Sequence, residues 1–343
     1  MVNNINIMIE EKLKNTDDRN PIKIAYNMNL RYYNDFIELM EIFNNNLSDK
    51  EIKDLLTNKL LLGNKYDKPH YLQAVSEVNL LYYVLRNYNN EFKYEPKYNG
   101  NKNPECSFKY NDTVINLEVK CPDLTSKIES ERMDGIKIFA PERMDQYKEV
   151  IFDIIDIVNT NSGCEKLREM KRFDNKLKDY LISASNKFPL SNDENFNILA
   201  VSLDIIGDLD EWYGYIFGNK GVFTSESFVL PKNFKNVDAI LLSNAMCGHI
   251  MYKECTEINV WKLEEGVNLL LLNPKKQSCK KGTFYKKYGI DMFEGLTKKF
   301  LLFQQQLDVE NTQANIIDYV KYKIIDLQII TVFTEYLKRN SCK

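Results

Sequence analysis

The stretch from Pro104 to Lys120 constrains the fold more than any other part of the chain. It divides at Asn111-Asp112, a pair that tolerates the positive φ of a tight turn between two strands. A two-residue loop there predicts a β-hairpin with one definite register. The expected cross-strand pairs are Tyr110 with Thr113, Phe108 with Ile115, and Cys106 with Leu117, which leaves Glu105 opposite Glu118.

This hairpin has two chemically different faces, because successive side chains of a strand point to opposite sides of the sheet. The apolar face carries Cys106, Phe108, Ile115, Leu117, Val119 and Cys121, and the polar face carries Glu105, Ser107, Asn116, Glu118 and Lys120. Like charges directly opposite each other on paired strands are destabilising. The pairing of Glu105 with Glu118 therefore indicates a compensating cation nearby. Lys120 is one candidate, and a divalent metal ion is the better one.

The spacing of these residues resembles the motif of the PD-(D/E)XK nuclease superfamily, whose members have the restriction-endonuclease-like fold. Pro104-Glu105 is followed, after a gap of twelve residues, by Glu118-Val119-Lys120. Glu105 replaces the usual Asp and is one methylene longer. The resemblance extends from about residue 71 to residue 205. It implies an α/β fold in which a βββαβ core with a mixed sheet is flanked by helices.

The same resemblance implies a metal-dependent nuclease. Glu105, Glu118 and Glu77, together with the Val119 carbonyl, would hold one or two Mg²⁺ ions, with Mn²⁺ as a substitute, because these ions prefer hard oxygen ligands. Lys120 would orient or deprotonate the attacking water, or balance charge on the transition state. DNA is expected as the substrate rather than RNA, with a restriction, defence or genome-maintenance role. Many members of the superfamily act as homodimers.

Three alternatives remain open at this stage. The first is a non-catalytic nucleic-acid-binding or regulatory module that retains the nuclease fold. The second is an assembly protein whose terminal helices bind a partner. The third is an ordinary hairpin whose charged face is solvated, since an acidic residue two positions before a lysine also occurs elsewhere, for example at Glu51/Lys53 and Glu95/Lys97. The short half of the motif therefore carries little information by itself.

The segment from Tyr71 to Asn87 predicts a strongly apolar helix upstream of the hairpin. Glu77 lies on its apolar stripe, one helical turn from Leu80 and Leu81. A carboxylate on such a stripe is partly buried unless it reaches solvent at the edge of the stripe. In the resembled superfamily a helix at this place supplies an acid to the metal site, so Glu77 is expected to be a ligand and Gln73 to support it.

The rest of the chain predicts a helical N-terminal region (1–65), a nuclease-like core with extra strands (66–273), and a basic segment with C-terminal helices (274–343). The first region is expected to cap the core, with a DNA-reading or partner-binding subdomain as the alternative. Expected strands are Glu91–Pro96, Asn195–Ile205, Trp212–Phe217, Val237–Ser243, Ile258–Leu263 and Val267–Leu272. Expected helices are Pro141–Val158, Asp174–Phe188 and Asn311–Lys338, with a charged loop over residues 123–141. Lys187 is expected in solvent or, alternatively, on a phosphate.

Composition limits the chemistry further. The chain has 343 residues but only two histidines, which disfavours histidine-dependent nucleases and Ser-His or Cys-His hydrolases. Its net charge of −3 supplies no global basic field for nucleic acid. The one strong basic patch lies between residues 274 and 300, where eight lysines oppose two acids. Its proposed nucleic-acid contacts are Lys275, Lys276, Lys280, Lys281, Lys286 and Lys287, and a solvated charged loop is the alternative.

The seven cysteines are odd in number and scattered, which predicts reduced thiols and a cytoplasmic protein. The apolar runs are too short or too polar to span a bilayer, so no membrane association is expected.

Overall fold

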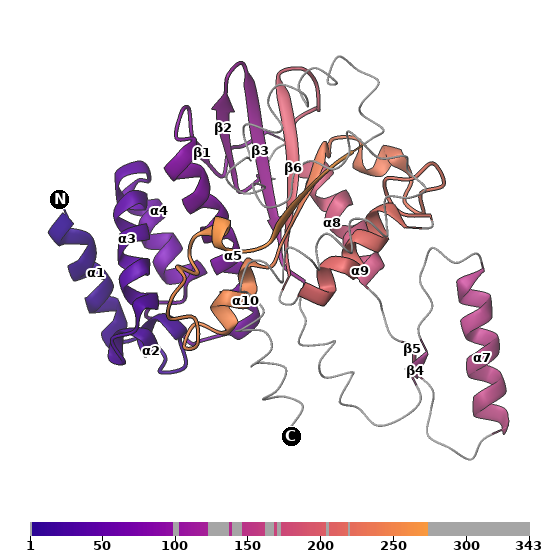
Figure 1. Ribbon diagram of the computed structural model, residues 1–343, viewed down its shortest axis with the longest axis horizontal. Helices are drawn as coiled ribbons and strands as arrows, with labels where there is room; N and C mark the ends of the chain where they lie inside the picture. The colour runs from indigo at the N-terminus through magenta and orange to yellow at the C-terminus, as the bar shows by residue number, and fades with distance from the viewer. Residues whose placement is uncertain are drawn as a thin grey trace.

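The computed structural model describes residues 2–98, 103–122, 137–138, 146–161, 168–169, 173–203, 206–218 and 220–273. Most of them form three layers (Figure 1): helices from the N-terminal part of the chain, a mixed sheet, and further helices on the opposite face of the sheet. The expected class, α/β with a mixed sheet, is confirmed. The basic segment with its six proposed nucleic-acid-binding lysines, and the C-terminal helix 311–338, lie outside the described residues.

The main sheet has the strand order β1-β2-β3-β6-β7-β8. Its strands are β1 (Lys93–Tyr94), β2 (Cys106–Tyr110), β3 (Thr113–Lys120), β6 (Asn195–Ser202), β7 (Ala239–Ser243) and β8 (Asn268–Leu272). The pairs β3–β6 and β6–β7 are parallel, and the others are antiparallel. Within the expected loop 123–141, β4 (Lys137–Ile138) pairs in parallel with β5 (Arg168–Glu169) as a separate small sheet.

The hairpin has the predicted register. Cys106 pairs with Leu117, Phe108 with Ile115, and Tyr110 with Thr113. Asn111 has a φ of 53°, the left-handed conformation that Asn adopts more readily than most residues. Strand β2 begins one residue after Glu105, whose N–H donates to the carbonyl of Leu117 at 2.9 Å. Glu105 therefore lies beside β3 at the end of the ladder.

The N-terminal helices are α1 (Val2–Lys14), α2 (Pro21–Asn27), α3 (Arg31–Asn46), α4 (Asp49–Asp54) and α5 (Lys68–Asn87), with the π-helix η1 (Leu55–Lys59) continuing α4. A capping box at Ser48 and Glu51 starts α4, and the Asp67 side chain accepts from the His70 N–H at the start of α5. The apolar sides of these helices share one hydrophobic core with the apolar face of the hairpin, and α5 contacts β3 directly.

The opposite face of the sheet is covered by α8 (Phe173–Lys187) and α9 (Ile206–Phe217), which appear on the far side from α5 in Figure 1. The predicted strand Trp212–Phe217 is wrong, because these residues form the end of α9. Trp212 and Tyr213, and then Tyr215 and Ile216, are buried. That spacing suits one side of a helix, although aromatic and β-branched residues favour strands by propensity.

Other boundaries also differ from expectation. The first strand is only two residues long, because Glu91 and Glu95 adopt positive φ values of 48° and 43°, which are incompatible with an extended ladder. The predicted strand Ile258–Leu263 is wrong: this segment is irregular and leads into the 3₁₀-helix η3 (Leu263–Glu265). There the Trp261 indole donates to the Tyr32 carbonyl at 3.0 Å, so a tertiary contact replaces strand pairing.

The remaining predicted elements are present with small shifts. The helix expected at Pro141–Val158 is α7 (Tyr147–Asn161), and α10 (Ala245–Ile250) and the 3₁₀-helix η2 (Pro231–Phe234) are additional. Cys106, Cys121, Cys247 and Cys255 are free thiols. Among the described residues, no helix combines the length and the apolar character that a bilayer crossing requires.

Candidate functional site

The structure brings the predicted acids into a cluster of ionised side chains that comes from both sides of the sheet. We define the carboxylate–lysine cluster as Glu77, Glu95, Glu105, Glu118, Lys59, Lys120 and Lys187. One half surrounds Glu118 and includes Lys187 from α8, and the other surrounds Glu105 and includes Glu77 from α5. The charges of Glu118 and Lys187 both act on Glu105, which joins the two halves.

Glu118 is the most enclosed member of the cluster, with a side chain that is 0% exposed. Its Oε1 lies 2.8 Å from Lys120 Nζ and 2.6 Å from Lys187 Nζ, although neither contact has the alignment of a good hydrogen bond. Its Oε2 is buried and has no hydrogen-bond donor among the described residues. The alternative of a hairpin with a solvated charged face is therefore wrong, because Glu105, Ser107, Asn116 and Glu118 of that face are all buried.

Lys187 lies in the last turn of α8, and its partner is Glu118 rather than solvent. The expectation of a solvated Lys187 is therefore wrong. The chain after α8 is held in place by Asn197 of β6, whose Nδ2 donates to the carbonyls of Pro189 and Asn236 at 3.0 and 2.7 Å. The polar face of the hairpin supports this residue, since Asn116 Nδ2 donates to Asn197 Oδ1 at 2.8 Å.

Glu105 has a strongly perturbed acidity. Burial raises its pKa to about 7, the negative charge of Glu77 adds to the rise, and the ammonium group of Lys59 opposes it. Because burial is the largest cause, the raised pKa reflects mainly the loss of water around the ionised carboxylate. A further cation beside Glu105 would favour its ionised form.

Lys59 is a member of the cluster that was not predicted from the sequence. It ends η1, and its Nζ lies 2.8 Å from Glu77 Oε2, 3.1 Å from Glu95 Oε1 and 3.3 Å from Glu105 Oε2. Burial alone would lower the pKa of Lys59, but the charges of Glu105 and Glu77 outweigh it and hold the pKa above its usual range. The sequence predicted a buried Glu77, and a buried carboxylate needs a cation from a neighbouring element. That need was the only sequence signal that pointed toward Lys59.

The other predicted site residues take these places. Glu77 is buried on α5, and Gln73 Nε2 donates to its Oε1 at 3.1 Å, as expected for a supporting residue. The Val119 side chain points away from Glu118 and packs into the hydrophobic core shared with α5. Only the backbone of Val119 can therefore contact a cation at the cluster. Lys120 lies two residues after Glu118 on β3, so the two side chains point to the same face of the sheet and contact each other.

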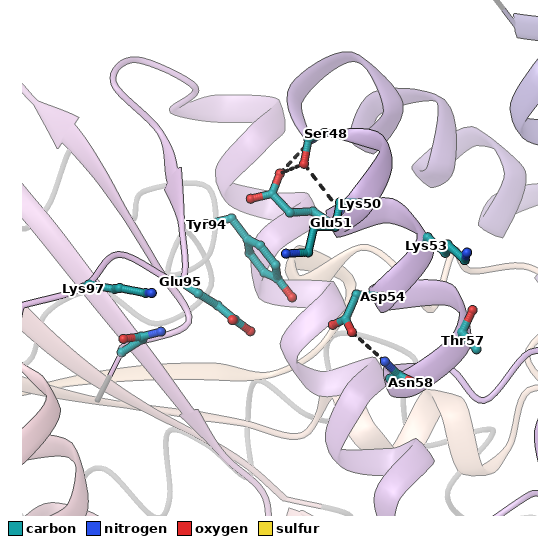
Figure 2. A pocket seen from close by; sticks show the side chains of 11 residues that line it. Ser48, Lys50, Glu51, Lys53, Asp54, Thr57, Asn58, Tyr94, Glu95 and Lys97 are labelled. Atoms are coloured by element: carbon teal, nitrogen blue, oxygen red, sulfur yellow. Dashed lines mark hydrogen bonds between the residues drawn. The ribbon is translucent and has the colours of Figure 1, made fainter. Parts of the chain in front are cut away.

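A pocket of about 740 Å³ adjoins the Glu105 half of the cluster (Figure 2). Tyr94 and Glu95 form one wall of the pocket, opposite Asp54 and Asn58, and Glu95 also contacts Lys59. Its remaining lining residues are Ser48, Lys50, Glu51, Lys53, Thr57, Lys97 and Asn103. The pocket is polar, and its lining combines three lysines with three carboxylates, those of Glu51, Asp54 and Glu95.

The cluster fits a divalent cation in its donor chemistry. Glu105 and Glu118 offer hard oxygen atoms, and the buried Glu118 Oε2 lacks any donor. Among the described residues no group of three or more acidic, histidine or cysteine side chains is arranged as a complete metal-binding set. Lysine ammonium groups lie between these carboxylates instead, so a bound ion would have to use Glu118 Oε2 and Glu105.

Neither histidine belongs to the cluster. His249 is buried, with Tyr32 Oη 2.8 Å from its Nδ1 and Asn79 Oδ1 2.9 Å from its Nε2. Burial lowers the pKa of His249 to about 3, so the ring is neutral. Its role is structural, at the junction of α3, α5 and α10.

Comparison with protein-family models, with curated proteins and with solved structures found no match to this chain.

Proposed function

We propose that this protein is a metal-dependent nuclease that hydrolyses phosphodiester bonds at the carboxylate–lysine cluster. The observation that carries the proposal is Glu118, which is fully buried, ion-paired through Oε1 to two lysines, and without a donor to Oε2 in the described part of the chain. An unsatisfied carboxylate oxygen in the protein interior is costly unless a cation binds it. Along the chain β1, β2 and β3 precede α8 and β6, with β4, α7 and β5 inserted before α8, and this order is compatible with the βββαβ core that the motif implies.

In this proposal Glu118 and Glu105 would hold Mg²⁺ or Mn²⁺, with the Val119 carbonyl as a further ligand. When bound, the ion would supply charge stabilisation at the scissile phosphate and would activate the attacking water. Lys120 orients the water or neutralises charge on the phosphate in the transition state. Lys187 holds Glu118 in position, and Glu77 acts on Glu105 both through its own charge and through their shared partner Lys59.

DNA is the proposed substrate, in a restriction, defence or genome-maintenance role, because the motif points to that class. The pocket beside Glu95 offers lysine contacts for phosphates through Lys50, Lys53 and Lys97, although the Glu51, Asp54 and Glu95 carboxylates in its lining balance their charge. Phosphate contacts by lysine contribute affinity that decreases with salt and does not depend on base sequence.

A non-catalytic nucleic-acid-binding module is the second candidate. It is favoured by the pairing of the four carboxylates with three lysines, which leaves the cluster nearly neutral without any metal ion. Such internal compensation would let the hairpin persist as a scaffold after catalysis had been lost.

Cleavage assays distinguish the two. Wild type, Glu118→Gln and Lys120→Met are incubated with supercoiled plasmid, single-stranded DNA and RNA in Mg²⁺, Mn²⁺ or EDTA. We expect metal-dependent cleavage that falls by a factor of roughly 10²–10³ in both variants. Glu91→Gln is the matched control, because Glu91 is an exposed carboxylate paired with Lys109 away from the cluster.

Folding of each variant is verified by circular dichroism and thermal unfolding. Cleavage by correctly folded Lys120→Met at the wild-type rate would contradict the assignment of Lys120. Binding of nucleic acid by wild type without cleavage in any metal would favour the non-catalytic module.

A further inference from the structure

Lys59 is bound by three carboxylates from three different elements. Glu77 comes from α5, Glu95 follows β1, and Glu105 precedes β2, and the Nζ–O distances are 2.8, 3.1 and 3.3 Å. The Lys59 side chain is only 18% exposed. An ion pair at the surface would lose little by opening, whereas this ammonium group replaces most of its water shell with carboxylate oxygens.

The position of Lys59 depends on the π-helix that ends at this residue. In η1 the backbone bond from Leu60 N–H to the Leu55 carbonyl, at 2.8 Å, spans five residues instead of four. The wider turn changes which way the last residue points compared with a continuing α-helix. Single π-turns of this kind are rare in proteins, and those that occur are often found at functional sites.

We propose that Lys59 is a built-in cation that takes the place of a second metal ion, so that the site binds one divalent ion and excludes another. This inference rests on the proposed nuclease function. Two-metal nuclease sites hold their ions about 3.5–4 Å apart with shared carboxylates. Here Glu105 would be the shared carboxylate, with the metal ion on the Glu118 side and the ammonium group on the Glu77 side.

The lysines are distributed differently around Glu118 and around Glu77. Lys120 and Lys187 both contact Oε1 of Glu118, whereas Oε2 has no donor among the described residues and is the oxygen left for a divalent ion. Around Glu77 the ammonium of Lys59 already contacts an oxygen of every carboxylate. A second divalent ion there would have to displace it or approach it closely, and like charges at such distances repel.

The test counts bound metal ions. Mn²⁺ binding to the full chain is measured by isothermal titration calorimetry and electron paramagnetic resonance for wild type, Lys59→Met, Lys59→Gln and Lys59→Arg. We expect one ion per chain in wild type and in Lys59→Arg, and two in the neutral variants, with the exchange coupling of a close Mn²⁺ pair in the spectrum. Lys109→Met is the control, since it removes an ion pair of 3.0 Å on the same hairpin far from Lys59.

Two ions in wild type, or one ion in both wild type and a folded neutral variant, would overturn the role of Lys59. Lys59→Gln keeps a hydrogen-bonding group toward the carboxylates in case Lys59→Met does not fold without metal. Absence of any bound ion in wild type would instead contradict the proposed nuclease function. The two failures are therefore distinguishable.

Discussion

At the scale of single residues, Glu105 and Glu118 differ in how their charge is compensated. Glu118 has two ammonium groups at one oxygen, whereas Glu105 shares one ammonium group with Glu77 and Glu95. Burial and the charge of Glu77 accordingly raise the pKa of Glu105 to about 7. A carboxyl group in such surroundings links protonation to folding as well as to metal binding.

Replacing Glu105 with Gln should stabilise the metal-free protein at alkaline pH. The pKa of Glu105 is about 7 in the folded state and 4.5 ordinarily, so between these pH values the folded protein keeps a proton that the unfolded chain has lost. The stability of the wild type is therefore fully present below pH 4.5 and decreases as the pH rises through 7. We expect Glu105→Gln to raise the free energy of unfolding by roughly 1–3 kcal/mol at pH 8 and to change it little at pH 4. Urea unfolding in EDTA at both pH values measures the difference.

Glu91→Gln, at an exposed carboxylate, is the control for that experiment and should have little effect at either pH. A destabilisation by Glu105→Gln at pH 8 would mean that the ion pair with Lys59 outweighs the burial of the charge.

At the scale of elements, α8 contributes to the site through its last residue, and the loop after it determines where that residue lies. Asn197 ties this loop to β6 through hydrogen bonds to the Pro189 and Asn236 carbonyls and accepts from Asn116. Its backbone N–H donates to Asp238 Oδ2 at 2.9 Å, which connects β6 with the residue just before β7. The network is buried, so its polar groups have no water to replace a lost partner.

Asn197→Ala should therefore destabilise the fold by about 1–3 kcal/mol, because it leaves two carbonyl groups and the Asn116 amide without a partner. Asn195→Ala is a matched control two residues away on the same strand, since the Asn195 amide contacts only the exposed Asn192 side chain, at 3.2 Å. Chemical unfolding of both variants measures the difference. A cost for Asn197→Ala no larger than that for Asn195→Ala would show that the network does not hold the loop.

At the scale of the whole molecule, the N-terminal helices belong to the same core as the sheet. From α3 alone, Phe36, Leu39, Met40 and Phe43 are fully buried against this core. Burying each such side chain contributes about 1.5–3 kcal/mol, so the four together approach the net stability of an ordinary domain, about 5–15 kcal/mol. The region predicted as a separate helical cap therefore contributes to the core and, through Lys59, to the site.

Deleting residues 1–65 should abolish cooperative folding of the remainder. The truncated chain would expose the apolar face of α5 and leave Glu77 and Glu105 without the ammonium group of Lys59. We expect an aggregating product, or one without a cooperative urea transition, whereas the full chain unfolds cooperatively. A truncated chain that stays monomeric and unfolds in a sharp transition would show that residues 66–343 fold independently.

Local patterns in the sequence were sufficient for the hairpin and for the predicted acids. The turn at Asn111-Asp112 and the alternation of side chains predicted the register and both faces, because these depend only on neighbouring residues and on strand geometry. The stripe around Glu77 similarly predicted a buried carboxylate on a helix. Strand or helix type was misjudged at Trp212–Phe217, where propensity favours a strand and burial against α8 and the sheet favours a helix.

Only the tertiary structure decided how the charges are compensated. Lys59 and Lys187 are separated from their carboxylate partners by 18 and 69 positions or more along the chain, so no local pattern connects them. Their placement depends on how η1 and α8 pack beside the sheet, which also buries a face that alternation could only classify as polar. The hairpin sequence thus specified which acids come together, and the packing of distant helices decided which cations they meet, because ion pairing depends on distance in space and not along the chain.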